Sequence, residues 1–250
     1  DKLQEAQENL IQSERLAAIG RISSSLAHEI NNPLVAVLGN AQLLLTEIPE
    51  DNPWRKDVEV IERCALTCKR LLHEVLGFAR RDDFKLVGTN VHWIINKALM
   101  LTQQRLANRN VQVEKMLMSD SPLVQASEPH LEQVFVNLIV NAQQAMPNGG
   151  TLKIHTYHIP AVASSDPDAP PAPDLIAVEF KDTGTGIIKE NLKKILEPFF
   201  TTKKPGEGTG LGLSVCNDIV KKHHGHLVIE SEGKGMGSTI TVRLPLSDKK

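Results

Sequence analysis

The chain contains 250 residues, of which 41% are hydrophobic and 4% aromatic, and its formal net charge at pH 7 is -2. This length allows two modest domains, whose cores must be mainly aliphatic. The balanced charge excludes a global attraction to nucleic acid or to an anionic membrane, and the sequence shows neither an apolar stretch of membrane-spanning length nor a signal peptide. Three cysteines without a C-x-x-C pattern favour reduced thiols in the cytoplasm.

The first part of the sequence has the apolar spacing of two long helices. Residues 3–48 keep helical spacing, and a second such helix follows the proline-containing turn at residues 49–53. A single helical hairpin leaves half of its apolar seam in water, so we expect two copies to associate into a four-helix bundle, as a homodimer. The seam positions are Ala27, Ile30, Leu34, Val37, Ala41, Leu44 and Ile48, followed by Val58, Ile61, Ala65, Cys68, Leu72, Val75 and Ala79.

Beyond residue 84 helical and alternating patterns follow one another, as in an α/β domain. The segment 160–174 is rich in proline and poor in large apolar residues, which predicts an excursion without regular structure between two strands. The patterns predict helices over Val91–Asn108, Leu131–Met146 and from Gly210 to about His223, and strands over Val111–Leu117, Thr151–Ile159, Leu175–Lys181, Leu227–Ser231 and Ser238–Leu244.

Three motifs in this second part indicate a nucleotide site. They are N-L-I-V-N-A from Asn137, D-T-G-T-G from Asp182, and G-E-G-T-G-L-G-L from Gly206. Closely spaced glycines let backbone N-H groups approach a phosphate chain, and the helix that starts near Gly210 offers the positive end of its dipole. The sequence has neither a P-loop nor the H-R-D and D-F-G motifs of Ser/Thr/Tyr kinases, so a different ATP-binding fold is required.

Particular side chains in these motifs suit ATP and Mg²⁺. Asn137 and Asn141 are four residues apart, which places two amides on one helix face, where they can ligate Mg²⁺ or bind phosphate. A merely polar helix surface is the alternative for this pair. The carboxylate of Asp182 can accept from the adenine amino group, whereas guanine has a carbonyl there; a simple turn-forming role is the alternative.

A third kind of signal lies upstream, in L-A-H-E-I-N-N-P-L from Leu26 to Leu34. A surface His-Glu pair is weak evidence by itself. However, His28 follows the seam residue Ala27 and so turns about 100° away from it, where a nucleophilic imidazole nitrogen could meet a phosphate. Asn32 lies one turn further on the same face. Pro33 removes a helical hydrogen bond and bends the helix there, or is a kink without further meaning.

The order of the three nucleotide motifs resembles the Bergerat ATP-binding fold of histidine kinases and gyrase-type ATPases. The upstream motif resembles the phosphoacceptor box of a two-component sensor histidine kinase. This resemblance implies a coiled-coil linker over residues 1–20 that follows a missing sensor region, which could anchor a longer protein to a membrane. It also implies a dimerising phosphotransfer hairpin over 21–84 and a Bergerat-type α/β sandwich over 85–250 that binds Mg-ATP. His28 would be phosphorylated and would pass its phosphoryl group to an aspartate of a response-regulator receiver domain.

The resemblance also implies residue roles. Glu29 acts as the base for His28, Asn32 supports a reverse phosphatase activity, and Asn141 is the principal Mg²⁺ ligand. Gyrase-type ATPases have a glutamate where this chain has Asn137, which favours transfer over hydrolysis. An ATP lid between Ile187 and Gly208 is implied, with Phe199 and Phe200 at its base and Lys203, alone or with Lys204, facing phosphate. The nucleotide set is Asn137, Asn141, Asp182, Gly184, Gly186, Phe199, Thr202, Lys203, Gly208, Thr209, Gly210, Leu211 and Gly212.

Two other function classes stay open at this point, a gyrase-like or chaperone-like ATPase and a non-catalytic dimerisation scaffold. Two apparent metal sites are discounted. His223, His224 and His226 straddle a helix-to-strand turn without matching ligands. Cys64 and Cys68 are four apart on a helix, and packing is the preferred interpretation.

Overall fold

The computed structural model describes residues 30–79, 84–120, 122–161, 173–203 and 208–247. The chain divides into two compact units, one of them helical and the other an α/β unit of residues 84–201 and 210–250. The segment 202–209 is not part of the α/β unit. The predicted linker over residues 1–20 and most of the proline-rich segment lie outside the described residues. Among the described helices, none has both the length and the apolar character needed to cross a membrane.

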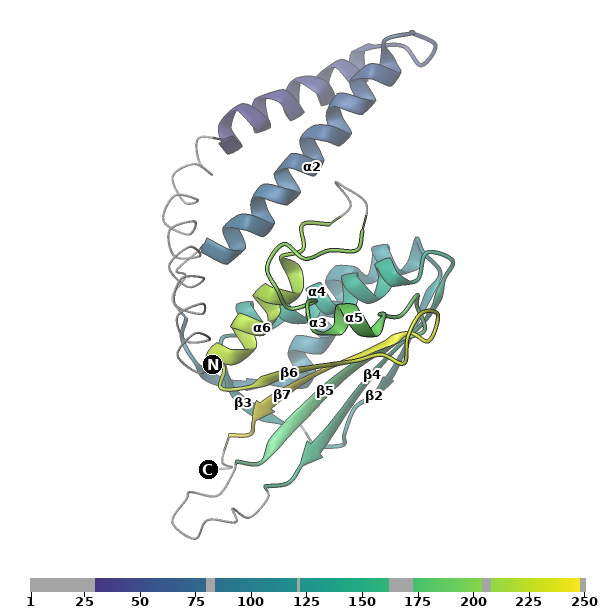
Figure 1. Cartoon of the computed structure of the whole chain (residues 1–250). Helices are drawn as coiled ribbons and strands as arrows, with labels where there is room; N and C mark the ends of the chain where they lie inside the picture. The colour runs from purple at the N-terminus through teal and green to yellow at the C-terminus, as the bar shows by residue number, and fades with distance from the viewer. Residues whose placement is uncertain (1–29, 80–83, 121, 162–172, 204–207, 248–250) are drawn as a thin grey trace, which may run out of the picture. The chain divides into compact units, whose positions relative to one another are not determined.

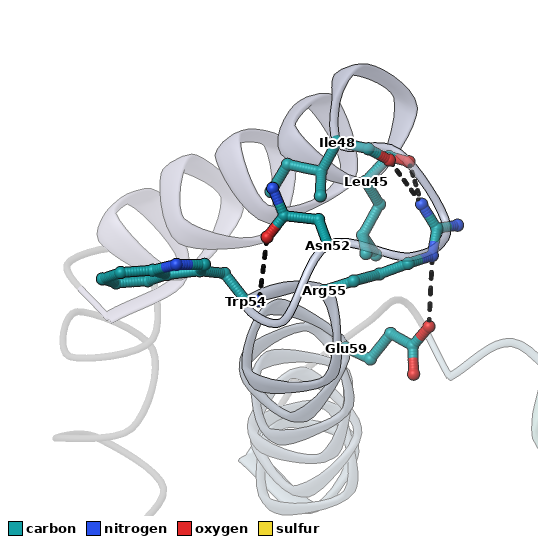
Figure 2. A network of polar contacts seen from close by, with 6 residues as sticks. All are labelled: Leu45, Ile48, Asn52, Trp54, Arg55 and Glu59. Carbon is teal, nitrogen blue, oxygen red and sulfur yellow. Dashed lines mark hydrogen bonds and ion pairs between the residues drawn. The ribbon is translucent and has the colours of Figure 1, made fainter.

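The helical unit is a hairpin of a helix over residues 30–47 and α2, Arg55–Ala79 (Figure 1). Arg55 fixes the turn, because its guanidinium donates to the carbonyl oxygens of Leu45 and Ile48 at 3.1 and 2.7 Å (Figure 2). These carbonyls lie at the C-terminal end of the first helix, where the helix itself supplies no donors. Asn52 completes the turn by accepting from the backbone N-H of Trp54 at 2.9 Å.

Within the part of the hairpin whose side chains are described, residues 30–69, few side chains are buried by the chain itself. The buried apolar residues of this part are Leu38, Ala41, Val58 and Ala65, each less than a tenth exposed. The predicted seam did not include Leu38. Many other large apolar side chains of the hairpin remain exposed, namely Ile30, Val35, Val37, Leu43, Leu44, Val60, Ile61 and Leu66.

The α/β unit is built on a five-stranded sheet with the order β2-β4-β5-β7-β6. The first pair, β2 with β4, is parallel and the other pairs are antiparallel. A separate antiparallel pair is formed by β1 and β3. The strands are β1 Val87–Asn90, β2 Val111–Met116, β3 Leu123–Ala126, β4 Gly150–Ile159, β5 Leu175–Asp182, β6 His226–Glu230 and β7 Ser238–Pro245.

Three helices cover one face of this sheet (Figure 1): α3 Val91–Ala107, α4 Glu128–Ala145 and α6 Gly212–Lys222. A short α5, Lys189–Leu192, follows β5. Asn90 caps α3 by accepting from the N-H groups of His92 and Trp93. The core between helices and sheet is aliphatic with few aromatics, as the composition predicts, and Phe135 of α4 meets Phe180 of β5 with 5.5 Å between ring centroids.

The predicted fold class, a helical hairpin followed by an α/β sandwich, is confirmed. Most boundaries agree within two residues, but β1, β3 and α5 were not predicted. The helix expected from Gly210 begins at Gly212, because Gly210 has φ 71° and so cannot belong to a right-handed helix.

Candidate nucleotide-binding site

Asp182 stands at the end of β5, opposite Ser238 of β7 in the sheet register. The residue is 5% exposed, and its carboxylate accepts two hydrogen bonds, from the backbone N-H of Gly184 at 2.7 Å and from the hydroxyl of Ser238 at 2.5 Å. A buried carboxylate needs such donors, and each oxygen has a second lone pair. The carboxylate is thus held in one orientation and can still accept from a ligand's amino group.

The loop that follows Asp182 is held against α4. The backbone N-H of Thr185 donates to the carbonyl oxygen of Ala145, the last residue of α4, at 2.9 Å. Gly186 has φ 67°, and a Cβ atom at this position would lie 2.0 Å from the carbonyl oxygen of Gly233. Only glycine fits this backbone. The D-T-G-T-G motif therefore forms a tight loop between α4 and the turn that connects β6 with β7.

Asn137 and Asn141 are one turn apart on α4, and both are half-buried. Cys216 of α6 makes a side-chain hydrogen bond with Asn137, and burial raises the pKa of this thiol to about 12 despite that bond. The thiol is therefore neutral at physiological pH. Asn141 lies beside the start of α6, since a Cβ atom on Gly212 would be 4.0 Å from its Nδ2.

The start of α6 is the phosphate end of the predicted site. Leu211 is the N-cap residue and has no polar side chain with which to cap the first N-H groups of the helix. Gly210 packs against Phe199, whose carbonyl carbon would be 2.4 Å from a Cβ atom on Gly210. Amide side chains from α4 and the N-H groups of α6 therefore come together, a combination that suits phosphate and a hard cation.

The predicted lid residues are only partly assembled by the α/β unit. Phe199 is 58% exposed and has φ 67°, which is rare for a residue with a side chain, whereas Phe200 is half-buried. Neither is a fully buried core residue. Thr202 and Lys203 are exposed and Gly208 and Thr209 half-buried, and all four fall outside the compact α/β unit. Lys204 is outside the described residues.

The predicted phosphoacceptor residues His28 and Glu29 also lie outside the described residues. Asn32 is exposed on the helix over residues 30–47, and this helix continues through Pro33. Placement of the phosphoacceptor histidine therefore remains an expectation from the sequence.

Within the described ranges, no group of three or more His, Cys, Asp or Glu side chains could hold a metal ion. His223 is a core residue, 2% exposed. The turn after β6 was not predicted to belong to the site. Ser231 contacts both this turn and the loop after Asp182. The glycine-rich stretch from Ser231 to Ser238 could have signalled it.

Comparison with protein families gives two matches in chain order. The model described as "His Kinase A (phospho-acceptor) domain" matches residues 18–84. The model described as "Histidine kinase-, DNA gyrase B-, and HSP90-like ATPase" matches residues 126–248. The first match contains His28, and the second contains Asn137, Asn141, Asp182 and the start of α6.

Curated relatives match nearly the whole chain. Sensor kinase CckA of Brucella abortus (strain 2308) is 37% identical over 246 residues, which cover 97% of this chain and 26% of that protein. Sporulation kinase C of Bacillus subtilis (strain 168) is 33% identical over 249 residues, covering 98% of this chain and 54% of that protein. The chain thus spans between about a quarter and a half of the length of these two relatives.

A solved structure supports the fold. ThkA in complex with the response regulator protein TrrA has a TM-score of 0.63 and 22% identity, covering 99% of this chain and 67% of that chain. At this identity the likeness concerns the fold alone.

Proposed function

We propose that this chain, which belongs to the two-component sensor histidine kinases, phosphorylates its own His28 with Mg-ATP and passes the phosphoryl group to an aspartate of a receiver domain. The observation that supports the proposal is that the α/β unit contains residues suited to both ends of a nucleotide, the base and the phosphates. Buried Asp182 forms the base end. Asn141 beside Gly212 forms the phosphate end.

At the base end, Asp182 selects adenine. Both of its carboxylate oxygens are held by protein donors, so the carboxylate does not have to reorganise when a nucleotide binds. An acceptor-only group favours the 6-amino group of adenine and repels the 6-carbonyl of guanine. The same carboxylate would therefore discriminate between purines by charge and hydrogen-bond direction.

At the phosphate end, Asn137 and Asn141 offer neutral oxygen ligands that fit Mg²⁺, which prefers oxygen donors and keeps several waters. Bound Mg²⁺ neutralises charge on the phosphates. The N-H groups at the start of α6 are proposed to bind phosphate oxygens, and Lys203 of the predicted lid is proposed to add positive charge. Because an amide cannot take up a proton from water, Asn137 favours transfer to a histidine over the hydrolysis expected of a gyrase-like ATPase.

His28 is the proposed acceptor. An unprotonated ring nitrogen attacks the γ-phosphorus, the bond between this phosphorus and the ADP oxygen breaks, and Glu29 accepts the proton released by the other ring nitrogen. The phosphoryl group on nitrogen is readily passed to a carboxylate of a receiver domain. Asn32, exposed on the same helix, is proposed to orient water for the reverse phosphatase reaction.

The helical unit supports a homodimer. Its two helices form an apolar groove lined by Ala36, Val37, Ala41, Leu44, Val58 and Ile61. Exposed apolar residues of this density require a covering surface, and a second copy of the same hairpin completes a four-helix bundle. The exposed free thiols of Cys64 and Cys68 suit a reducing cytoplasm, where receiver domains and ATP are available.

Labelling with γ-³²P-ATP and Mg²⁺ tests the proposal. Wild-type protein should give a phosphoprotein that is labile in acid and stable in alkali, and addition of a panel of receiver domains should remove the label through transfer. His28→Gln should lose the label, whereas His224→Gln, which changes an exposed histidine outside the site, should keep it. Label that persists in His28→Gln contradicts the assignment, and sustained ATP turnover without a phosphoprotein would indicate the gyrase-like alternative.

A further inference from the structure

Two loops meet at the base end of the site. One is the loop over residues 182–187 and the other is the turn over residues 231–237, between β6 and β7. Their backbones are joined directly, since the N-H of Gly235 donates to the carbonyl oxygen of Thr185 at 2.6 Å and that of Gly237 donates to Gly184 at 3.1 Å. We call this arrangement the loop junction. It carries Asp182 at one end of the first loop and precedes Ser238 on β7.

The hydroxyl of Ser231 lies within the loop junction. It donates to the carbonyl oxygen of Gly237 at 2.6 Å and accepts from the backbone N-H of Ile187 at 2.9 Å. A longer contact from the N-H of Gly233, at 3.4 Å, occupies its second lone pair. A hydroxyl has one proton and two lone pairs, so all of its hydrogen-bonding capacity is used.

The contact with Ile187 crosses from one loop to the other, whereas the contacts with Gly233 and Gly237 lie within the turn. Ile187 is the residue after the D-T-G-T-G motif, and Gly237 is the residue before Ser238. Ser231 therefore fixes the far end of the first loop and the near end of β7 with a single group. Asp182 and Ser238 lie between these fixed points and are hydrogen-bonded to each other.

We propose that Ser231 is a positioning residue for the base end of the nucleotide site. It holds the loop junction so that the Asp182 carboxylate meets the adenine amino group at one spacing. The inference rests on the proposed function, because it assigns a role in binding ATP. Ser231 acts through Asp182 and Ser238 and is not itself assigned a contact with the nucleotide.

Removal of the hydroxyl has a predictable pattern of effects. Ser231→Ala leaves the N-H of Ile187 and the carbonyl of Gly237 without their side-chain partner, so the base end loosens. The dissociation constant for Mg-ATP should rise roughly fivefold to twentyfold, the range given by the loss of one or two such hydrogen bonds. The phosphate end is formed by α4 and α6, so phosphorylation at saturating ATP should proceed at an unchanged rate.

The experiment that tests this inference measures binding to the full chain by calorimetry in the presence of Mg²⁺. Three probes are compared: ATP, inosine triphosphate and inorganic tripolyphosphate. Inosine triphosphate has a carbonyl in place of the adenine amino group, and tripolyphosphate has no base. In Ser231→Ala, ATP should bind more weakly, the preference for ATP over inosine triphosphate should fall, and tripolyphosphate should bind as in wild type. Ser231→Thr retains a hydroxyl and should restore both affinity and preference.

Thr102→Val is the matched control, because it removes a buried hydroxyl of the same unit that donates to Ala98 within α3, away from the loop junction. It should leave the preference for ATP unchanged. Equal weakening of ATP and tripolyphosphate in Ser231→Ala, or an unchanged ATP preference, overturns the inference. If Ser231→Ala does not fold, Ser231→Cys is used in its place, because a thiol forms weaker hydrogen bonds than a hydroxyl. It is judged by the same two measurements, the weakening of ATP relative to tripolyphosphate and the preference for ATP over inosine triphosphate. Wild-type protein that shows no preference for ATP contradicts the proposed function instead.

Discussion

The two units of the chain differ in what completes them. In the α/β unit, large side chains such as Phe135, Ile94 and Leu131 are fully buried by the unit's own helices and sheet. In the helical unit, the buried apolar side chains among those described are Leu38, Ala41, Val58 and Ala65, while side chains such as Ile61 remain 48% exposed. Among the hairpin side chains that the structure describes, more large apolar residues are exposed than buried, so a covering surface is expected there.

This difference indicates which interactions each unit lacks. The helical unit has unburied apolar surface, which a second copy can cover. The α/β unit has a complete core and presents the amide of Asn141 on α4 beside the N-terminal end of α6, where a ligand can bind. Association and nucleotide binding should therefore be separable by mutation.

The largest expected effect concerns association. Ile61→Lys places a charge on the apolar groove of the helical unit, and each dimer contains two such positions. Burial of an isoleucine side chain contributes roughly 1.5–3 kcal/mol, so the dimer should weaken by at least ~100-fold. Analytical ultracentrifugation should show monomers, while calorimetry shows ATP binding of wild-type strength. Asp57→Lys, at an exposed polar position of α2, is the control and should remain a dimer.

A mutation in the core of the α/β unit should cause a loss of stability of similar size, without any effect on association. Phe135→Ala removes a ring that is fully buried and packs on Phe180. The free energy of unfolding of the α/β unit should fall by about 3–5 kcal/mol, measured by urea denaturation. Because this core is complete within one chain, the midpoint should not depend on protein concentration. A concentration-dependent midpoint would mean that this unit also needs a partner.

A change at Asp182 should weaken the binding of ATP without loss of the fold. Asp182→Asn replaces one of two acceptor oxygens by an amide N-H₂ group, which then faces either the N-H of Gly184 or the hydroxyl of Ser238. The affinity for Mg-ATP should fall by roughly 2–3 kcal/mol, or about 30-fold to 150-fold. Asp218→Asn, at an exposed carboxylate of α6, should bind ATP normally. Equal affinities in both variants would contradict adenine recognition by Asp182.

Periodicity predicted the long elements of the fold and failed for the short ones. Strands β4, β5 and β7 are eight or ten residues long, which gives enough alternating positions to define them. Strands β1 and β3 and helix α5 have four residues each, too few to establish a period. Their formation depends on pairing and packing with distant segments.

The residues of the nucleotide site could likewise be predicted from the sequence only in part. Glycine at position 186 could be predicted to matter, because the D-T-G-T-G spacing signals a backbone that excludes side chains. Ser231 could not, because its three partners are backbone groups and one of them belongs to a residue 44 positions away. A serine at the end of a strand indicates only a turn. Its contribution becomes visible only when β5, β6 and β7 are placed side by side.

The smallest predicted effect concerns pH and the core at the start of α4. His223 accepts from the backbone N-H of Ser127 through Nε2 at 2.9 Å, and its Nδ1 donates to Ile219 at 2.7 Å. Phe84 packs edge-on against this ring, with 4.7 Å between centroids. Only the neutral imidazole with its proton on Nδ1 satisfies both bonds. Burial lowers the pKa of His223, and the neighbouring His130 and His224 lower it further.

The sign of the pH effect follows from this shift. The folded pKa is below the unfolded value of about 6.5, so the unfolded chain takes up the proton first as the pH falls. The contribution of His223 is therefore complete above pH 6.5 and is lost as the pH falls through the folded pKa. We expect a loss on the order of 1 kcal/mol, the value of one buried hydrogen bond, in urea denaturation at decreasing pH. His223→Gln has no proton to gain and should flatten the profile, whereas exposed His224→Gln should leave the slope nearly as in wild type. An unchanged slope in His223→Gln would place the acid sensitivity of the α/β unit elsewhere.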